Sequence, residues 1–255
     1  MMRIRVERSG ATGRITLARK EKKNALDYAA ARELREALRE LAADAAVRVV
    51  LLAADGPDFC AGADLAALHA LLDASASEQV KDAEALGDVF RVIRDMPQVV
   101  VAAVRGRALA GGAGLATACD IVIAEEGARF GYPEVRVGFV PAMVMALLRR
   151  QVGEKRAFEL VATGRQVPAS EALELGLVSR VVTAADFDAA VEQMVSELAA
   201  MPAHALRSTK QLFYSLDATN FEDGIAQAIR VNVEARSTSE FREGVRRFAP
   251  GERKS

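Results

Sequence analysis

The sequence has little of the chemistry that metal and thiol enzymes use. Its 255 residues include two cysteines, Cys60 and Cys119, and two histidines, His69 and His204. Two thiols cannot make a disulfide framework, and these four residues have no spacing typical of a zinc site. Tryptophan is absent and aromatic residues make up 5% of the chain, so Ala, Val, Leu and Ile must build the core. Metal chemistry and a Ser-His-Asp triad are therefore poor explanations of function.

The sequence also lacks a strong net charge and any long apolar run. Lys and Arg number 34 against 35 Asp and Glu, a formal charge of −1, which does not provide the basic field that nucleic acid requires. The longest uncharged runs, residues 108–119 and 137–148, are shorter than the roughly 18 apolar residues that cross a bilayer. The charged start, MMRIRVERSG, is unlike a signal peptide. We expect a cytoplasmic protein that binds neither nucleic acid nor membrane.

The hydrophobic pattern of the first two thirds of the chain alternates between strands and helices. Residues 3–17 have the alternation and glycine turns of a hairpin, and residues 27–44 have apolar residues at helical spacing. Further elements are expected as buried strands at 47–53, 99–104 and 121–124, and as helices from 61 to 72 and over 80–95. This order is typical of an α/β protein with parallel strand pairing.

After Gly164 the pattern is helical, apart from a short strand over residues 178–182. The expected helices are 187–200, 203–216, 221–236 and 240–248. Their apolar stripes must pack on the parent domain or on a neighbouring subunit.

Two strands lead into turns of small residues that open helices. One turn is Cys60-Ala61-Gly62-Ala63-Asp64, and the other is Ala110-Gly111-Gly112. Backbone N–H groups at a helix start have no partner within the helix, so two such turns that converge would supply the donors of an oxyanion hole. The simpler alternative is that small residues only permit tight turns and close packing. The second turn does not have the G-x-G-x-x-G spacing of a dinucleotide site.

A carboxylate follows the second turn. Glu134 ends the segment Phe130-Gly131-Tyr132-Pro133-Glu134 and is bordered by Val135 and Val137. An apolar pocket there would raise its pKa and suit it to proton transfer, whereas a glutamate in a loop is more often solvated.

These segments together resemble the crotonase superfamily, the enoyl-CoA hydratase/isomerase family. Residues 59–65 (FCAGADL), 108–112 with Cys119-Asp120, and 130–134 (FGYPE) stand in the order and spacing of that family. Residues 22–26 (KKNAL), 172–182 and 243–248 (EGVRRF) resemble its remaining signatures, so the resemblance covers nearly the whole chain. It implies an α/β fold, a crotonase-like spiral of strand-strand-helix units over residues 1–195. It also implies a C-terminal helical trimerisation region over 196–255, with a homotrimer or a hexamer made of two trimers.

The resemblance also implies an enzyme of acyl-CoA and fatty acid metabolism that stabilises a thioester enolate. Carried over by motif position, Ala63 and Gly111 would donate to the thioester oxygen, and Glu134 would be an acid/base. Coenzyme A would enter only as part of the substrate, with no other cofactor and no metal. The residues expected to bind substrate are Lys22, Ala61, Asp64, Leu65, Gly112 and Tyr132.

The sequence departs from the hydratases of the family at the two positions where a second acid could stand. Their second glutamate falls three residues after Gly111, where this chain has Gly114, and the aspartate that some relatives place eight residues after Glu134 is Ala142 here. A single carboxylate suits a shift of a double bond from the 3- to the 2-position. Hydration would need another group to hold water, and the candidates are Asp73, Glu78, Asp82, Glu84, Asp88 and, for the pocket wall, His69.

Several functions remain open at this point. Hydration and isomerisation of an enoyl-CoA are the leading pair. A non-catalytic acyl-CoA-binding subunit, thioester decarboxylation or hydrolysis, and a nicotinamide oxidoreductase are the alternatives.

Overall fold

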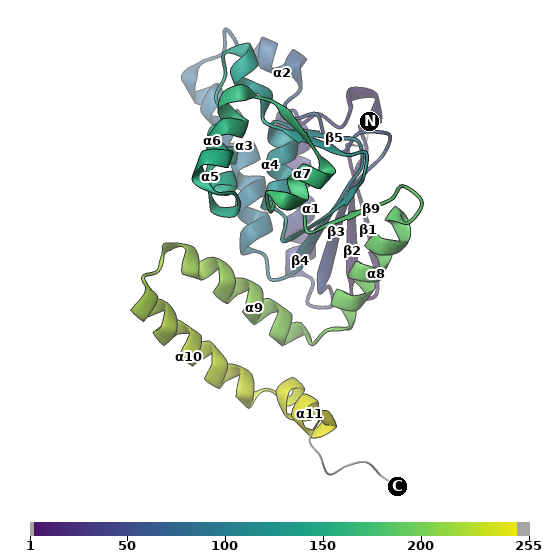
Figure 1. The fold of residues 1–255 in the computed structure, drawn as a ribbon, viewed down its shortest axis with the longest axis vertical. Coiled ribbons are helices and arrows are strands. Elements are labelled where there is room, and N and C mark those ends of the chain that lie inside the picture. Colours follow the sequence, from purple (N-terminus) through teal and green to yellow (C-terminus); the bar gives the residue numbers. More distant parts are fainter. Residues whose placement is uncertain (1–2, 249–255) are drawn as a thin grey trace. The chain divides into compact units, whose positions relative to one another are not determined.

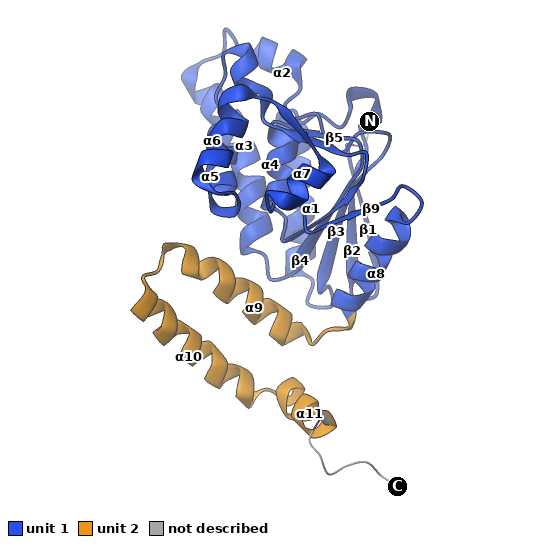
Figure 2. Cartoon of the chain, viewed as in Figure 1, with its two compact units in different colours: residues 1–199 blue, residues 200–255 orange. Residues whose placement is uncertain are grey.

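The chain folds into two compact units. The structure is a computed structural model that describes residues 3–248; the last part of the expected C-terminal region, residues 249–255, lies outside the described residues. Unit 1 is Met1–Ala199 and unit 2 is Ala200–Ser255 (Figure 2). The division falls four residues after the boundary that the sequence resemblance implies.

A six-stranded sheet organises unit 1 (Figure 1). Its strand order is β1-β2-β3-β4-β6-β9, in which β1 and β2 pair antiparallel and every later pair is parallel. The strands are β1 Ile4–Ser9, β2 Thr12–Leu17, β3 Val49–Ala54, β4 Val99–Val104, β6 Ile121–Glu125 and β9 Arg180–Val182. The α/β class, the hairpin and the parallel strands expected from the sequence are confirmed.

The two faces of this sheet differ because side chains alternate along a strand. Ile15, Leu52 and Val104 point into the hydrophobic core, which the helices complete. The opposite face carries Arg14 and Arg105, and helix α8 (Phe187–Ala200) lies against it, with the Arg105 guanidinium 4.3 Å from the centre of the Phe187 ring.

Helix α1 (Tyr28–Ala43) shows how local sequence sets an element. Asp27 caps it, since its side chain accepts from the Ala30 amide at 2.8 Å. Leu34, Leu38 and Leu41 recur on one face and are fully buried. The neighbouring helices that pack in the same core are α3 (Ala76–Asp95), α4 (Gly111–Ala118) and α5 (Ala142–Gln151).

The remaining elements of unit 1 are short. A second sheet has the order β5-β7-β8, and it was not expected from the sequence because its strands have only three residues each. These elements are β5 Arg107–Leu109, β7 Arg129–Gly131, β8 Gln166–Pro168, α2 Leu65–Ala70, α6 Glu154–Thr163, α7 Ala169–Glu174, and the 3₁₀ turns η1 Lys20–Lys22 and η2 Pro133–Val137.

Unit 2 consists of helices α9 (Ala203–Ser215), α10 (Phe221–Ser237) and α11 (Ser239–Phe248), with a 3₁₀ turn at Leu216–Ala218. The three helices predicted there are confirmed to within a residue or two. One apolar stripe of α10 is exposed: Phe221, Ile225, Ile229 and Val233. Among the described residues, no helix is both long and apolar enough to cross a membrane.

Candidate active site

Two isolated β-bridges hold the first predicted turn, residues 60–64. Leu26 pairs with Ala63, and Cys60 pairs with Ala108. In the first bridge, the Leu26 amide donates to the Gly62 carbonyl at 2.7 Å and the Asp64 amide donates to the Leu26 carbonyl at 2.9 Å. Because successive residues of an extended segment face opposite ways, the Ala63 amide points away from Leu26.

The segment before Leu26 is held by a buried asparagine. Asn24 has a left-handed backbone (φ 55°), and its side-chain amide donates to the carbonyls of Asp55 and Asp58 at 2.9 and 2.8 Å. Its Oδ1 atom accepts from the Arg19 amide at 2.9 Å. Asn24 belongs to the KKNAL motif, and asparagine is among the residues other than glycine that adopt this conformation most readily.

The two turns approach each other closely. A Cβ placed on Gly62 would lie 3.2 Å from the Gly111 nitrogen and 2.8 Å from the Ala110 Cβ. Within residues 3–248, neither the Ala63 amide nor the Gly111 amide donates a hydrogen bond. Two unpartnered donors in adjacent turns are the arrangement that an oxyanion hole requires. The structure thus brings together the two amides expected from the sequence.

The Gly111 turn is set by packing. A Cβ on Gly112 would lie 2.2 Å from the Cys60 carbonyl oxygen, so only glycine allows this approach. Ala110 precedes the helix at φ 51° and ψ −126°, a region that alanine rarely adopts, and Ala110 is held there by a hydrogen bond from its amide to the Gly131 carbonyl at 2.8 Å. Burial raises the pKa of the Cys60 thiol to about 12, which keeps it protonated.

Glu134 lies in the 3₁₀ turn η2 and is 9% exposed. Its Oε2 atom is buried and has no hydrogen-bond partner in the described part of the chain. Burial raises the pKa of the carboxyl group above its ordinary value, and a hydrogen bond from its own backbone amide only partly opposes this effect. A buried carboxyl group with one unpartnered oxygen and a raised pKa is typical of a proton-transferring group.

The position where a second carboxylate would stand is already filled. A Cβ on Gly114 would lie 2.7 Å from the Val144 Cγ2 atom and 2.9 Å from the Phe90 Cζ atom. Both of these side chains are buried. Gly114 is therefore a point of close apolar packing, and the structure leaves no room there for a side chain that could hold water.

The expected substrate-binding residues have different surroundings. Tyr132 is buried, its hydroxyl lies 3.0 Å from the Thr117 Oγ1 atom, and burial raises its pKa. Lys22 is half exposed, with its Nζ atom 4.0 Å from the Asp64 carboxylate. The others are Ala61, which is half-buried and bonded to the Lys23 carbonyl, Leu65, which is exposed, and Gly112, which is buried against Cys60.

Asp64 has a clear local role. Its Oδ1 atom accepts from the amides of Ala66 and Ala67 at 3.0 and 3.4 Å and so caps α2. Burial raises the pKa of Asp64, but these two amides, Lys22 and Arg19 outweigh that effect, and the pKa lies below its ordinary value.

Most of the acids that were candidates to hold a water molecule pair with other residues or are exposed. Asp88 pairs with Arg35 and Arg91, and Glu78 forms a capping box with Ser75. Asp82 is half-buried, and burial and the charge of Asp27 raise its pKa. Asp73, Glu84 and His69 are exposed. In the described residues, no three His, Cys, Asp or Glu side chains form a group that could hold a metal ion.

Known proteins show which family this geometry belongs to. The family model for enoyl-CoA hydratase/isomerase matches residues 7–254. A Thermus thermophilus protein named "Putative enoyl-CoA hydratase" is 42% identical over 228 residues, 89% of this chain and 90% of the relative. The enoyl-CoA hydratase structure of Mycobacterium smegmatis is 36% identical with a TM-score of 0.93, over 97% of this chain and 96% of that one.

A second solved structure agrees. The enoyl-CoA hydratase of Bacillus anthracis is 29% identical with a TM-score of 0.91, over 97% of this chain and 96% of that one. The spiral fold with a C-terminal helical region is thereby confirmed, and the chain belongs to the enoyl-CoA hydratase/isomerase family of the crotonase superfamily.

Proposed function

We propose that this enzyme moves the double bond of an enoyl-CoA thioester from the 3- to the 2-position, with Glu134 as its single acid/base. The proposal is carried by two features seen together: one buried carboxylate whose Oε2 atom has no partner in the described residues, and a filled space at Gly114. A double-bond shift needs one group that removes a proton and returns it, whereas hydration also needs a group that positions water.

The proposed reaction begins at the two free amides. Ala63 and Gly111 donate to the thioester oxygen, where negative charge develops when a proton leaves the carbon next to the carbonyl. Glu134 takes this proton from C2, and the electron pair of the C–H bond moves into the conjugated dienolate. The same carboxyl group then returns the proton to C4, which leaves a double bond between C2 and C3 and restores the enzyme.

The raised pKa of Glu134 supports this cycle. A carboxylate whose charge is destabilised by burial is a stronger base than an exposed one. Its protonated form, in turn, persists long enough in a buried site to deliver the proton to C4. Water is not required in either step.

The names of the relatives favour a second candidate, hydration of a 2-enoyl-CoA. In that reaction the hydroxyl of water adds to C3 and a proton adds to C2. Asp82 is the half-buried acid of α3 with a raised pKa, so it is the group to test as a water holder.

For the remaining residues of the site, the proposed roles come from the resemblance to the family. We propose that Lys22, the exposed cation beside Asp64, meets the nucleotide part of coenzyme A. Ala61, Leu65, Gly112 and Tyr132 are proposed to shape the substrate site. No cofactor besides the coenzyme A of the substrate is proposed, and the exposed stripe of α10 is proposed to form a trimer or hexamer.

The test compares two thioesters on the wild type, Glu134→Gln and Glu174→Gln. Gain of conjugated-enoyl absorbance from a 3-enoyl-CoA measures isomerisation, and its loss from crotonyl-CoA measures hydration. We expect isomerisation by the wild type, its loss by about 10²–10⁴-fold in Glu134→Gln, and no change in Glu174→Gln, an exposed glutamate of α7. Wild-type hydration that Asp82→Asn abolishes would favour the second candidate. Binding without either reaction would make this a non-catalytic subunit.

A further inference from the structure

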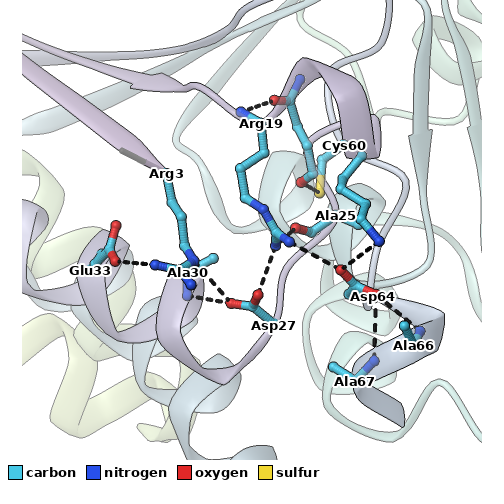
Figure 3. A network of polar contacts seen from close by, with 12 residues as sticks. Arg3, Arg19, Ala25, Asp27, Ala30, Glu33, Cys60, Asp64, Ala66 and Ala67 are labelled. Atoms are coloured by element: carbon cyan, nitrogen blue, oxygen red, sulfur yellow. Dashed lines mark hydrogen bonds and ion pairs between the residues drawn. The ribbon is translucent and has the colours of Figure 1, made fainter. Parts of the chain in front are cut away.

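Arg19 lies beside the Ala63 turn and contacts three acceptors around it (Figure 3). Its Nη1 atom donates to the Ala25 carbonyl at 2.8 Å and pairs with the Asp27 carboxylate at 3.0 Å, and its Nη2 atom donates to Asp64 at 3.1 Å. These three acceptors flank the bridge between Leu26 and Ala63 on both of its segments. One guanidinium group therefore ties together the two segments that orient the Ala63 amide.

The two carboxylates that Arg19 joins are used in the same way. Asp27 caps α1 through Oδ1 and meets Arg19 through Oδ2. Asp64 caps α2 through Oδ1 and also meets Arg19 through Oδ2. Arg19 thus fixes the starts of two helices relative to each other, across the β-bridge that contains the oxyanion donor.

The three charged side chains of this network are largely removed from solvent. The side chains of Arg19, Asp64 and Asp27 are 13%, 9% and 19% exposed. Charges removed from water in this way must be paired in good geometry, and the loss of Arg19 would leave Asp64 with the more distant Lys22, at 4.0 Å, as its cation. Arg3 also pairs with Asp27, but at 3.6 Å, with 34% of its side chain exposed and without a contact to Asp64.

We propose that Arg19 is a positioning residue for the oxyanion hole: by bridging Asp27 and Asp64 it holds the Ala63 amide where the thioester oxygen binds. This inference rests on the proposed function. Arg19 lies three residues before Lys22, a residue expected to bind substrate, yet its guanidinium faces the carboxylates of Asp27 and Asp64. Its planar fork reaches acceptors on both segments at once from two nitrogen atoms, whereas a lysine ammonium is a compact point charge without this fork.

The proposal is tested with Arg19→Gln and Arg19→Lys, and Arg3→Gln serves as the matched control. Displacing one oxyanion donor costs rate far more than affinity, because the donor acts on charge that develops during the reaction. We expect kcat on the 3-enoyl-CoA to fall about 10- to 100-fold in both Arg19 variants, with KM changed less than about threefold. Arg3→Gln should keep kcat within about twofold of wild type.

A spectroscopic readout separates positioning from turnover. 4-Dimethylaminocinnamoyl-CoA is a push-pull chromophore whose absorption moves to longer wavelength when its carbonyl is polarised. We expect a red shift on binding to the wild type and to Arg3→Gln, and a smaller shift in the Arg19 variants. Wild-type kcat and red shift in Arg19→Lys, or equal losses in Arg19→Gln and Arg3→Gln, would overturn the proposal.

Asp64→Asn tests the same network if the Arg19 variants are unfolded. If the Arg19 variants do not fold by circular dichroism, Asp64→Asn replaces them, since asparagine still caps α2 but carries no charge for Arg19. It should show the same loss of kcat and red shift, and wild-type values would overturn the proposal. A wild type that reddens the probe without turning over any enoyl-CoA would contradict the proposed function alone, because the probe still measures how the carbonyl is polarised.

Discussion

The two turns that present the free amides are built in opposite ways. The Gly111 turn opens a helix, α4, whose residues are all buried, and packing against Leu86, Phe90 and Val144 holds it. The Ala63 turn is held by ion pairs and by a carboxylate cap on α2. The position of the Gly111 amide therefore depends on packing in the core, and the position of the Ala63 amide depends on a polar network.

This difference determines how each donor can be perturbed. A packed turn responds to single atoms, because a buried interior has no space to accept them. A polar turn responds to charge and to pH, because its geometry depends on paired ionised groups. The same electrostatic task is thus distributed over two kinds of support, which meet where Gly112 packs against the Cys60 carbonyl.

The largest effect is expected from Gly112→Ala, which would break the packed turn. The new Cβ would lie 2.2 Å from the Cys60 carbonyl oxygen and 2.7 Å from the Cys60 Cβ, and backbone cannot yield as a flexible side chain can. We expect unfolding free energy to fall by about 3 kcal/mol or more in urea titrations at one protein concentration. Gly153→Ala is the control, since its Cβ meets nothing within 4 Å. A stable Gly112→Ala protein would contradict the packing argument.

Gly114→Glu tests the same turn at its filled position. The side chain would have to displace Val144 and Phe90 and bury a carboxyl group among apolar atoms. We expect a loss of about 2–3 kcal/mol and no gain in hydration of crotonyl-CoA. Denaturation and the absorbance assay measure the two effects. A folded variant that hydrates crotonyl-CoA faster than wild type would show that the site accepts a second acid after all.

Asp64→Ala probes the polar turn. It removes the cap of α2 and one partner of Arg19, and we expect a loss of about 2 kcal/mol at neutral pH. Because the folded pKa of Asp64 is lowered, its contribution is present above the ordinary pKa of about 3.9 and is lost as pH falls through the folded pKa. Denaturation at pH 7 and at decreasing pH should show the two proteins converge in acid. A pH-independent difference would mean that the cap acts without its charge.

Ala110→Gly should relieve the packed turn. Alanine at φ 51° and ψ −126° is strained, whereas glycine adopts such a conformation without cost from Cβ. The greater entropy of glycine in the unfolded chain offsets part of this gain. We expect a net stabilisation of about 1 kcal/mol, measured as a rise in the denaturation midpoint. A clear destabilisation would show that the Ala110 methyl group contributes more through packing than the backbone loses through strain.

The contrast between the turns also shows what sequence alone can predict. The strands of the six-stranded sheet, most amphipathic helices and the small-residue turns follow from local patterns and were predicted close to their observed bounds, whereas α6, α7 and the second sheet were not predicted. The filling of the Gly114 position was not predicted either, because Phe90 and Val144 come from α3 and α5 and meet only in the folded core. The sequence shows that position 114 has no carboxylate, but it does not show which side chains fill the space there.

The polar network was equally hidden. Arg19 and Asp64 are 45 residues apart in the sequence, and nothing in either segment alone indicates that they pair. The neighbouring Val135 and Val137 allowed a buried Glu134, but a glutamate in a loop is more often solvated, so the prediction of its acid/base role depended on the family resemblance. Charge pairing and burial depend on the tertiary structure. The motifs therefore located the site, but they did not predict the residues that hold its turns in place.

Glu134→Gln is expected to have the smallest effect on stability, with a sign opposite to that of Asp64→Ala. Burial raises the folded pKa of Glu134, so between its ordinary pKa of about 4.3 and the raised value the native state binds more protons than the unfolded state. Wild-type stability therefore falls as pH rises through this window. Glutamine carries no charge, so the variant should be about 0.5–1 kcal/mol more stable than wild type at pH 8 and equal to it near pH 4. Thermal denaturation at both pH values measures this, and a variant less stable at pH 8 would mean that the ionised carboxylate has a stabilising partner.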